Sequence, residues 1–360
     1  MENLLTQNKK ILIADDVEIN RDMLTEILED DYQIEAVENG EEVIRILSER
    51  LDEFAVLLLD LLMPKLDGYG VLKMMNERGW MDKLPVLIIS GEQSIQSEKD
   101  CFDKGVSDFI RKPLDATLVR RRVGNVAELS LYRRSLEQKV EEQTQRLKKV
   151  NENIVDILGS VVESRNLESG LHIQRVKGYT KILAFEMMDA YKEYGLTKEK
   201  IEVIVSASAL HDVGKVAIPD NILLKPGRFT PEEFEIMKTH TTRGCELLDG
   251  IRGNWDEEYN KASWEICRYH HERFDGKGYP DHLMGEDIPI AAQLVSIADV
   301  YDALVSKRCY KEAYELESAY NMIINGECGI FSPKLIECFK KSRNKFEALA
   351  LNKELMEIKE

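Results

Sequence analysis

Histidines and carboxylates recur together in the second half of the chain, in a pattern suited to binding metal ions. Glu168 and His172 are four residues apart, a spacing that places both on one face of a helix. His211 and Asp212 are adjacent in A-L-H-D-V-G-K, and Lys215 follows about one turn later. The other candidate ligands are His240, His270, His271 and Asp299. A mixture of imidazoles and carboxylates without thiolates favours Fe or Mn, with Zn as the alternative, over a structural zinc or a calcium site.

This candidate set holds more ligands than one ion uses. Its five histidines, two aspartates and one glutamate suit two or three ions that share bridging oxygens. Such ions lower the pKa of bound water and stabilise both the attacking and the leaving oxygen of a phosphate ester. We therefore expect hydrolysis of a phosphodiester. A single histidine is more often a core or surface residue than a ligand, so this prediction depends on the set as a whole.

A second group of acidic residues lies in the first third of the chain. Asp15 and Asp16 end one apolar run, Asp60 ends another, Ser90 ends a third, and Lys112 follows the last. If these runs are parallel strands, their carboxyl ends meet at one edge of a sheet and the polar side chains converge. Clustered carboxylate oxygens suit Mg²⁺, and phosphoryl transfer to a carboxylate needs that ion and a cation for the new phosphate. A lone strand-end aspartate is usually a turn former or a helix cap, but the group together indicates a phosphorylation site.

Short apolar runs that alternate with helical segments must position this second group. The runs predict strands over residues 11–15, 33–37, 56–60, 85–90 and 107–110. Strands that alternate with helices form a parallel sheet covered on both faces. We expect an α/β doubly wound domain with a five-stranded parallel sheet over residues 1–125.

A long helix with a heptad seam is predicted after Pro113. Its seam residues follow alternating spacings of four and three: Leu136, Val140, Gln143, Leu147, Val150, Ile154, Ile157 and Val161. The pattern predicts a two-stranded coiled coil and hence a homodimer. The alternative is a single amphipathic helix packed on its own domain. We assign residues 126–160 to this helical linker, and residues 161–350, which show helical periodicity throughout, to an all-α domain.

The composition limits the classes of protein and partner. A chain of 360 residues holds about two or three domains. It has no apolar stretch of the ~18 residues needed to cross a bilayer and no secretory signal, so we expect a cytoplasmic protein that does not bind membranes. The six cysteines form no C-x-x-C pair, and the net charge of -17 argues against a nucleic-acid polymer as partner. A small anionic substrate is still compatible, because metal ions supply positive charge locally.

Residues 8–125 resemble the receiver domain of response regulators. The matching motifs are I-L-I-A-D-D, L-L-L-D-L-L-M-P-K-L-D-G, I-I-S-G and F-I-R-K-P. The resemblance implies an upstream sensor histidine kinase as partner and Mg²⁺ as cofactor. It assigns Asp60 as phosphoacceptor, with Asp15, Asp16 and the Leu62 carbonyl contacting Mg²⁺. It further implies that Lys112 contacts the phosphate and that Ser90 and Phe109 are the pair of residues that change conformation on phosphorylation.

Residues 155–345 resemble the HD-GYP domain, which belongs to the HD superfamily of hydrolases. The matching motifs are H-D-V-G-K, K-T-H, H-H-E-R-F-D-G-K-G-Y-P, I-A-D-V-Y-D-A-L and R-C-Y-K. The resemblance implies metal-dependent hydrolysis of cyclic di-GMP to pGpG and/or GMP. The implied metal ligands are Glu168, His172, His211, Asp212, His240, His270, His271 and Asp299. A glutamate at position 168 accompanies a third ion in this family and favours a trinuclear site.

The same resemblance implies roles for residues outside the ligand set. Lys215 is similar to the lysine near the scissile phosphate and, with the ligands His211 and Asp212, is expected to carry catalysis. Arg308 and Lys311 look like contacts to the dinucleotide, since an arginine fork can grip a phosphate or a guanine edge. A further set resembles the loop that shapes the site and docks diguanylate cyclase domains: Gly276, Gly278, Tyr279 and Pro280. Cys309 departs from the proline usual in this family, which puts the rigidity of its loop in question.

Together the motifs predict a two-component response regulator with an enzymatic output. We expect phosphorylation of Asp60 to reorganise Ser90 and Phe109, to shift the helical linker and thereby to control access to the metal site. One alternative is a catalytically degenerate sensor or scaffold that docks cyclase domains, and another is an HD hydrolase of a different nucleotide. The filled ligand positions argue against degeneracy. The direction of control, and the choice between cyclic di-GMP and a mixed cyclic GMP-AMP, stay open.

Overall fold

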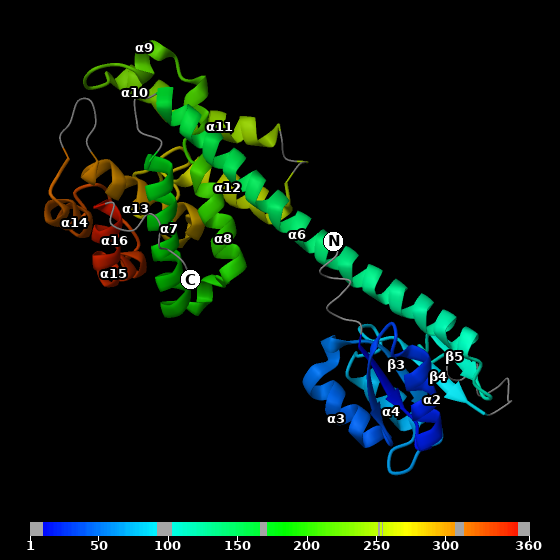
Figure 1. Ribbon diagram of the computed structural model, residues 1–360. Coiled ribbons are helices and arrows are strands. Elements are labelled where there is room, and N and C mark those ends of the chain that lie inside the picture. Colours follow the sequence, from blue (N-terminus) through cyan, green and yellow to red (C-terminus); the bar gives the residue numbers. More distant parts are fainter. Residues whose placement is uncertain are drawn as a thin grey trace. The chain divides into compact units, whose positions relative to one another are not determined.

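The computed structural model describes residues 10–91, 103–165, 171–250, 253, 255–306 and 313–351. The chain divides into two compact units, Met1–Arg146 and Leu147–Glu360. The first unit is built around a sheet and the second consists of helices, which confirms the predicted combination of fold classes (Figure 1).

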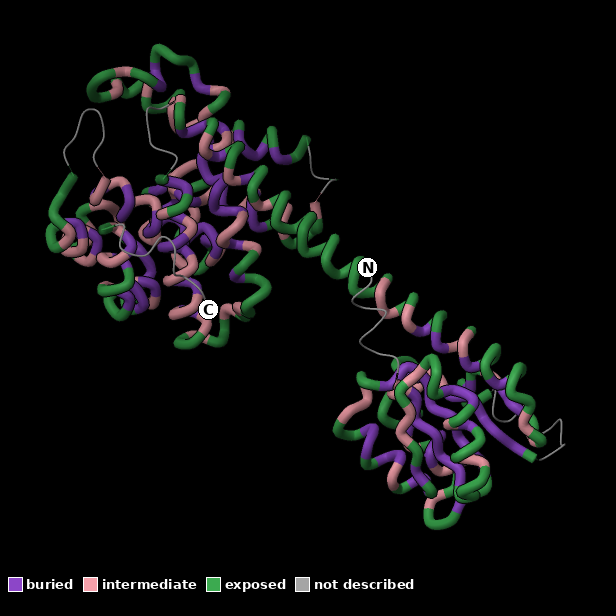
Figure 2. Tube along the Cα trace, in the orientation of Figure 1, coloured by how far each residue is buried: buried purple, intermediate pink, exposed green. Residues whose placement is uncertain are grey.

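The sheet of the first unit has five parallel strands in the order β2-β1-β3-β4-β5. The strands are β1 (Lys10–Ala14), β2 (Gln33–Val37), β3 (Phe54–Asp60), β4 (Val86–Ser90) and β5 (Asp108–Arg111). Each lies within two residues of the run that predicted it. Every residue of β3 and β4 is buried, as expected for strands covered on both faces (Figure 2).

Helices cover both faces of this sheet because alternate strand residues point to opposite sides. Ile11 and Ile13 pack with buried residues of α2 (Glu18–Leu28) and of the first turns of α6 (Ala116–Arg165). Leu12 and Ala14 pack on the other side with α3 (Gly40–Arg50) and α4 (Gly68–Glu77). A short 3-10 helix, η1 (Leu51–Glu53), leads from α3 into β3. Because the helices cover both faces of the sheet, the acidic group predicted from the sequence lies at the carboxyl ends of the strands.

Helix α6 is continuous from Ala116 to Arg165 and runs from the first unit into the second. From residue 136 to residue 151 every side chain is exposed (Figure 2). Its last turns pack on the second unit through the buried residues Val155, Val162 and Glu163. The apolar seam is exposed over its length, including Leu147 at 62% and Ile157 at 62%. The seam is therefore a different face of the helix from the one that packs on the second unit.

The second unit consists of helices joined by short 3-10 turns. Its α-helices are α7 (Leu171–Ala190), α8 (Lys198–Ala207), α9 (Asp220–Leu223), α10 (Pro231–Lys238), α11 (His240–Asp249), α12 (Glu257–Tyr269), α13 (Ile290–Val305), α14 (Leu316–Ile324), α15 (Pro333–Lys341) and α16 (Arg343–Ala350). Its 3-10 helices are η2 (Lys192–Tyr194), η3 (Ser208–Leu210), η4 (Val213–Ala217) and η6 (Gly285–Asp287). The core lies between α7 and α13, where Tyr179 and Tyr301 are fully buried with rings 5.1 Å apart. Within the described ranges, no helix is both long and apolar enough to cross a bilayer.

Candidate metal centres

Elements distant in the sequence bring the candidate ligands of the second unit together. His172 lies in the first turn of α7, and His211 and Asp212 lie between η3 and η4. His240 begins α11, and Asp299 lies within α13. His270 and His271 follow the last residue of α12. Seven of the eight predicted ligands are therefore in the described part of the chain, on five separate segments.

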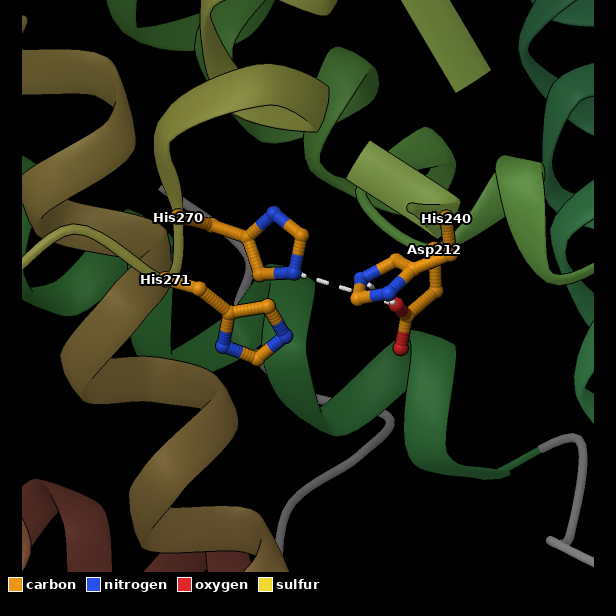
Figure 3. Close-up of side chains that lie close together, drawn as sticks. All are labelled: Asp212, His240, His270 and His271. Atoms are coloured by element: carbon orange, nitrogen blue, oxygen red, sulfur yellow. Dashed lines mark ion pairs between the residues drawn. The ribbon is translucent and has the colours of Figure 1, made fainter. Parts of the chain in front are cut away.

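These seven residues form two adjoining groups. In one group, ligand atoms of Asp212, His240, His270 and His271 all lie within 4.8 Å of one another. Figure 3 shows the two histidines that follow α12 approaching Asp212 and His240 from the opposite side. The second group is His172, His211 and Asp299, again within 4.8 Å. Asp212 joins the groups, because its Oδ1 lies 3.1 Å from His240 Nε2 and its Oδ2 lies 3.2 Å from His211 Nε2.

The imidazole rings are oriented through their Nδ1 atoms. His211 Nδ1 lies 2.8 Å from the Ser208 carbonyl oxygen, and His240 Nδ1 lies 2.8 Å from the Met237 carbonyl oxygen. His270 Nδ1 lies 2.9 Å from the Ile266 carbonyl oxygen. A carbonyl oxygen only accepts, so each Nδ1 must donate a proton, and in a neutral ring Nε2 then carries the lone pair. His172 is held in the same way by Asp302, whose Oδ2 lies 2.8 Å from its Nδ1.

The Nε2 atoms and Asp212 Oδ1 present electron pairs to one another. Within the described residues, the Nε2 atoms of His172, His211, His240 and His270 and the Oδ1 atom of Asp212 are buried without a hydrogen-bond partner. Buried polar atoms are normally paired, so unpaired ones need an explanation. An imidazole lone pair that faces a carboxylate oxygen at about 3 Å is repulsive unless a cation or a proton lies between them. These donor atoms therefore fit metal ions of the kind that imidazole and carboxylate ligands prefer.

The pKa values reflect the same concentration of charge. Burial would lower the pKa of His211, but the carboxylates of Asp212, Asp299 and Glu163 together outweigh it and raise this pKa to about 9. Burial lowers the pKa of His270 to about 3 and that of His271 well below its usual value, so both rings are neutral. Burial opposes ionisation of Asp212, yet Lys215 and His211 hold its pKa well below the usual range. His270 and His271 are thus in the neutral form that metal ligands require, and a metal ion would replace the proton that Asp212 favours on His211.

Gly214 in the H-D-V-G-K motif allows Asp212 and His240 of the first group to approach each other. A Cβ atom at this position would lie 1.8 Å from the His240 carbonyl oxygen and 2.5 Å from the Gly244 backbone nitrogen. The backbone of η4 thus touches the first turn of α11, which places His240 against Asp212. Any side chain at position 214 would separate them.

Lys215 lies beside the ligand groups. Its Nζ is 2.6 Å from Asp212 Oδ2 and 3.3 Å from Glu163 Oε1. The side chain is 13% exposed, so the ammonium is close to the surface of the site yet fixed by two carboxylates. Glu163 was not predicted from the sequence, because it belongs to no motif and lies within the long helix.

Two further residues support the candidate ligands. Asp302 accepts hydrogen bonds from Arg175 Nε at 2.5 Å and from Arg175 Nη2 at 3.0 Å, and it also contacts His172. It lies three residues after Asp299 on α13, a spacing that could have indicated this. The ring of Tyr279, in the G-Y-P loop, stacks on His271 with centroids 4.8 Å apart. No sequence pattern indicates that contact.

Several predicted site residues lie outside the described part of the chain. They are the eighth ligand Glu168, the dinucleotide contacts Arg308 and Lys311, and the variant position Cys309. Their roles stay predictions.

The acidic group of the first unit is also assembled. Ligand atoms of Asp15, Asp16 and Asp60 lie within 4.8 Å of one another. Asp15 and Asp16 directly follow β1, and Asp60 is the last residue of β3. Lys112 Nζ is 2.5 Å from Asp60 Oδ2 and 2.9 Å from Asp15 Oδ2. Burial raises the pKa of Asp60, with Lys112 opposing it. Burial would lower the pKa of Lys112, but Asp60 and Asp15 outweigh it and raise that pKa.

The predicted switch residues lie on the strands next to this acidic group. Ser90 is the last residue of β4 and is buried, and Phe109 is buried in β5. Ile88 of β4 pairs with Phe109, and Ser90 pairs with Arg111. Ser90 thus lies at the carboxyl end of β4, whereas Phe109 lies two residues before the end of β5.

Replacing Asp302 by Asn should weaken metal binding without unfolding the second unit. The amide keeps the shape but loses the charge that pairs with Arg175 and orients His172, so we expect the affinity for Mn²⁺ to fall by about 10- to 100-fold. Calorimetric titration of the metal-free protein measures this. The control is Asp156→Asn, which removes an aspartate paired with Lys177 at 2.6 Å and away from the ligands. Equal affinities in wild type and Asp302→Asn would contradict the orienting role.

Comparison with known proteins identifies a matching family for each unit. A family model described as a response regulator receiver domain matches residues 11–124, and one described as an HD domain matches residues 170–329. A probable cyclic di-GMP phosphodiesterase of Vibrio cholerae serotype O1 is 34% identical over 352 residues, which span 94% of this chain and 79% of the relative. The cyclic di-GMP phosphodiesterase response regulator RpfG of Xanthomonas campestris pv. campestris is 31% identical over 349 residues, spanning 94% and 89%.

A third relative matches the helical unit alone. The 3'3'-cGAMP-specific phosphodiesterase 2 of Vibrio cholerae is 39% identical over 203 residues, which span 56% of this chain and 37% of that protein. The two matches over nearly the full length identify the arrangement of domains as well as the domains themselves. The chain belongs to the family of response regulators that join a receiver domain to the HD domain of cyclic di-GMP phosphodiesterases.

Proposed function

We propose that this response regulator hydrolyses cyclic di-GMP to pGpG and/or GMP in a metal-dependent reaction that phosphorylation of Asp60 controls. One observation carries the enzymatic part: four imidazole Nε2 atoms and one Asp212 oxygen are buried, unpaired among the described residues and directed at one another. Such an arrangement needs cations or protons between the facing donor atoms, and the number of donor atoms favours metal ions. The full-length similarity to proteins named cyclic di-GMP phosphodiesterases supports the choice of substrate.

Two or three Fe or Mn ions, with Zn as the alternative, would be held by the predicted ligands. Asp212, His240, His270 and His271 form one group and His172, His211 and Asp299 the other, and Glu168 is the proposed additional ligand. The ions would bind the phosphate oxygens and lower the pKa of bound water. Two groups that share Asp212 favour at least two ions.

The protein supplies positioning and positive charge near these groups. Lys215 is proposed to stabilise the charge that develops on the phosphate or the leaving oxygen, since its ammonium lies beside Asp212. The chain as a whole carries a charge of -17, so an anionic substrate needs such a local source of attraction. Arg308 and Lys311 are proposed as contacts to the dinucleotide. Diguanylate cyclase domains are proposed to dock at the loop with Tyr279.

A mixed cyclic GMP-AMP is the second candidate substrate. The supporting observation is that a protein named as specific for 3'3'-cGAMP is 39% identical over the helical unit. A protein named cyclic di-GMP phosphodiesterase is 43% identical over a similar length, so cyclic di-GMP stays the first candidate. The alternative of a catalytically degenerate sensor or scaffold is less well supported. All seven described candidate ligand positions carry a histidine or an aspartate, and these side chains are grouped.

In the receiver unit we propose that a histidine kinase supplies the phosphoryl group to Asp60, with Mg²⁺ bound by Asp15 and Asp16. Lys112, already within 2.5 Å of the Asp60 carboxylate, would pair with the new phosphate. Ser90 and Phe109 would respond to the changed charge at the strand ends. The continuous helix α6 is the proposed connection to the metal-binding unit.

We further propose that α6 pairs with α6 of a second copy. The heptad seam, which includes Leu136, Val150 and Val161, is exposed in the single chain. The alternative of packing on its own domain is disfavoured for the seam, because Val155 and Val162 supply that contact from another face. Charged residues flank the seam, as in two-stranded coils.

Hydrolysis should depend on the predicted ligands. Protein purified without oxygen and loaded with Fe²⁺ or Mn²⁺ is expected to convert cyclic di-GMP, whereas the double variant His211→Ala, Asp212→Ala should lose about a hundredfold or more. Chromatography of the nucleotides separates pGpG, GMP and substrate, and a parallel assay uses 3'3'-cGAMP. His282→Asn is the matched control, because His282 is exposed with φ 59°, a conformation that Asn tolerates. Fully loaded wild type that cleaves neither dinucleotide would disprove the proposal.

Phosphorylation should alter the rate only through Asp60. Acetyl phosphate with Mg²⁺ is expected to change wild-type turnover by about fivefold or more and to leave Asp60→Asn unaffected. Asp30→Asn, which replaces an exposed aspartate of the same unit, should respond like wild type. An identical response of the wild type and the Asp60 variant would rule out this control.

Charges in the seam should separate the proposed dimer. Leu147→Glu combined with Ile154→Glu is expected to reduce the mass in solution from twice the 41.4-kDa chain mass to a single chain, because like charges would face each other across the coil. Light scattering during gel filtration gives the mass. Gln138→Glu combined with Gln145→Glu adds the same charge at exposed positions off the seam and should stay dimeric. A dimer that survives the seam charges would show that it forms elsewhere.

A further inference from the structure

The last turn of α6 places a buried carboxylate beside the candidate metal centres. The Glu163 side chain is 1% exposed, and its Oε1 accepts a hydrogen bond from Lys215 Nζ at 3.3 Å. Its Oε2 is also buried and has no hydrogen-bond partner among the described residues. A carboxylate buried in this way costs free energy unless a cation compensates it, and Lys215 is the cation that contacts it.

Lys215 contacts two carboxylates that belong to different parts of the fold. Asp212, at 2.6 Å from Nζ, belongs to the ligand groups, whereas Glu163 belongs to α6. A lysine has a flexible four-carbon stem, so one anionic partner leaves the ammonium free to swing around it. Two partners define its position. Without Glu163, the ammonium would lose one of these two carboxylates and would still contact Asp212, which the proposed metal ions also need.

The end of α6 is itself fixed to the segment that carries Lys215. Arg165 Nη1 donates a hydrogen bond to the Val216 carbonyl oxygen at 2.8 Å, and Arg165 Nη2 donates one to Asp220 Oδ1 at 2.6 Å. Gly159 lies so close to η3 that a Cβ atom there would be 2.4 Å from the Ala209 carbonyl oxygen. The backbone of α6 therefore packs directly on the residues before His211. These contacts fix the position of the helix backbone that carries Glu163.

We infer that Glu163 is a positioning residue that holds the Lys215 ammonium at the metal centres. This inference rests on the proposed function, because it gives Lys215 its part in that reaction. It also places the end of α6 in contact with a group that acts on the substrate. A displacement of α6 along or about its axis would move Glu163 and so change where the lysine charge lies.

A double-mutant cycle on the full-length, metal-loaded protein tests the inference. Glu163→Gln keeps the size of the side chain and removes its charge, so we expect kcat to fall by about tenfold with KM, metal content and melting temperature unchanged. Glu163→Asp, which keeps the charge, should lose less. In a Lys215→Met background, Glu163→Gln should have no further effect, because a residue that acts only through Lys215 has nothing left to position. Glu142→Gln, an exposed glutamate of the same helix, is the control.

A second measurement does not need catalysis. Reductive methylation of the metal-free protein, followed by mass spectrometry of peptides, gives the modification rate of Lys215. This rate should rise severalfold in Glu163→Gln and stay unchanged in Glu142→Gln, because a weakened partner releases the amine. The positioning role is wrong if the rate does not change, if Glu163→Gln loses metal, or if it lowers kcat equally with Met at position 215. If the wild type cleaves no dinucleotide while methylation still rises, the proposed function fails and the positioning contact stands.

Discussion

The tautomer of the clustered imidazoles is the constraint on which the rest of the second unit depends. Backbone carbonyls accept the Nδ1 protons of His211, His240 and His270, and Asp302 takes that place for His172. The lone pairs must then point inward, toward carboxylate oxygens. Each carbonyl lies three or four residues before its histidine, so the local helical turn itself sets the orientation. Because each ring is already oriented locally, packing between distant helices has only to bring the imidazole rings close together.

Much of this arrangement could be predicted because it repeats simple rules. The alternation of apolar runs and helices placed all five strands within two residues, and the rule that parallel strands end at one edge gathered Asp15, Asp16 and Asp60. The motif histidines were found because chemistry limits which residue types hold cations. The grouping of seven ligands on five segments needed the resemblance to a known domain, since spacing alone does not bring α7, α11 and α13 together.

The supporting residues could not be predicted, because their roles arise from contacts between segments. Gly214 is required by the His240 backbone, Tyr279 stacks on His271, and Glu163 contacts Lys215 from the end of the long helix α6. None of these pairs has a characteristic spacing. The heptad pattern, conversely, was visible in the sequence but did not reveal that the opposite side of the same helix packs on the second unit.

The exposed middle of α6 has a consequence for the length of the chain. Between residues 136 and 151 the helix makes its own hydrogen bonds and buries no side chain, so residues could be inserted or removed there at little cost in packing. Each added residue turns everything beyond it by ~100° and advances it by ~1.5 Å, whereas seven residues restore nearly the same orientation. The length of this stretch therefore fixes the rotational phase between the start of the seam at Leu136 and Glu163. Insertions of seven residues would preserve that phase, and insertions of one or two would destroy it.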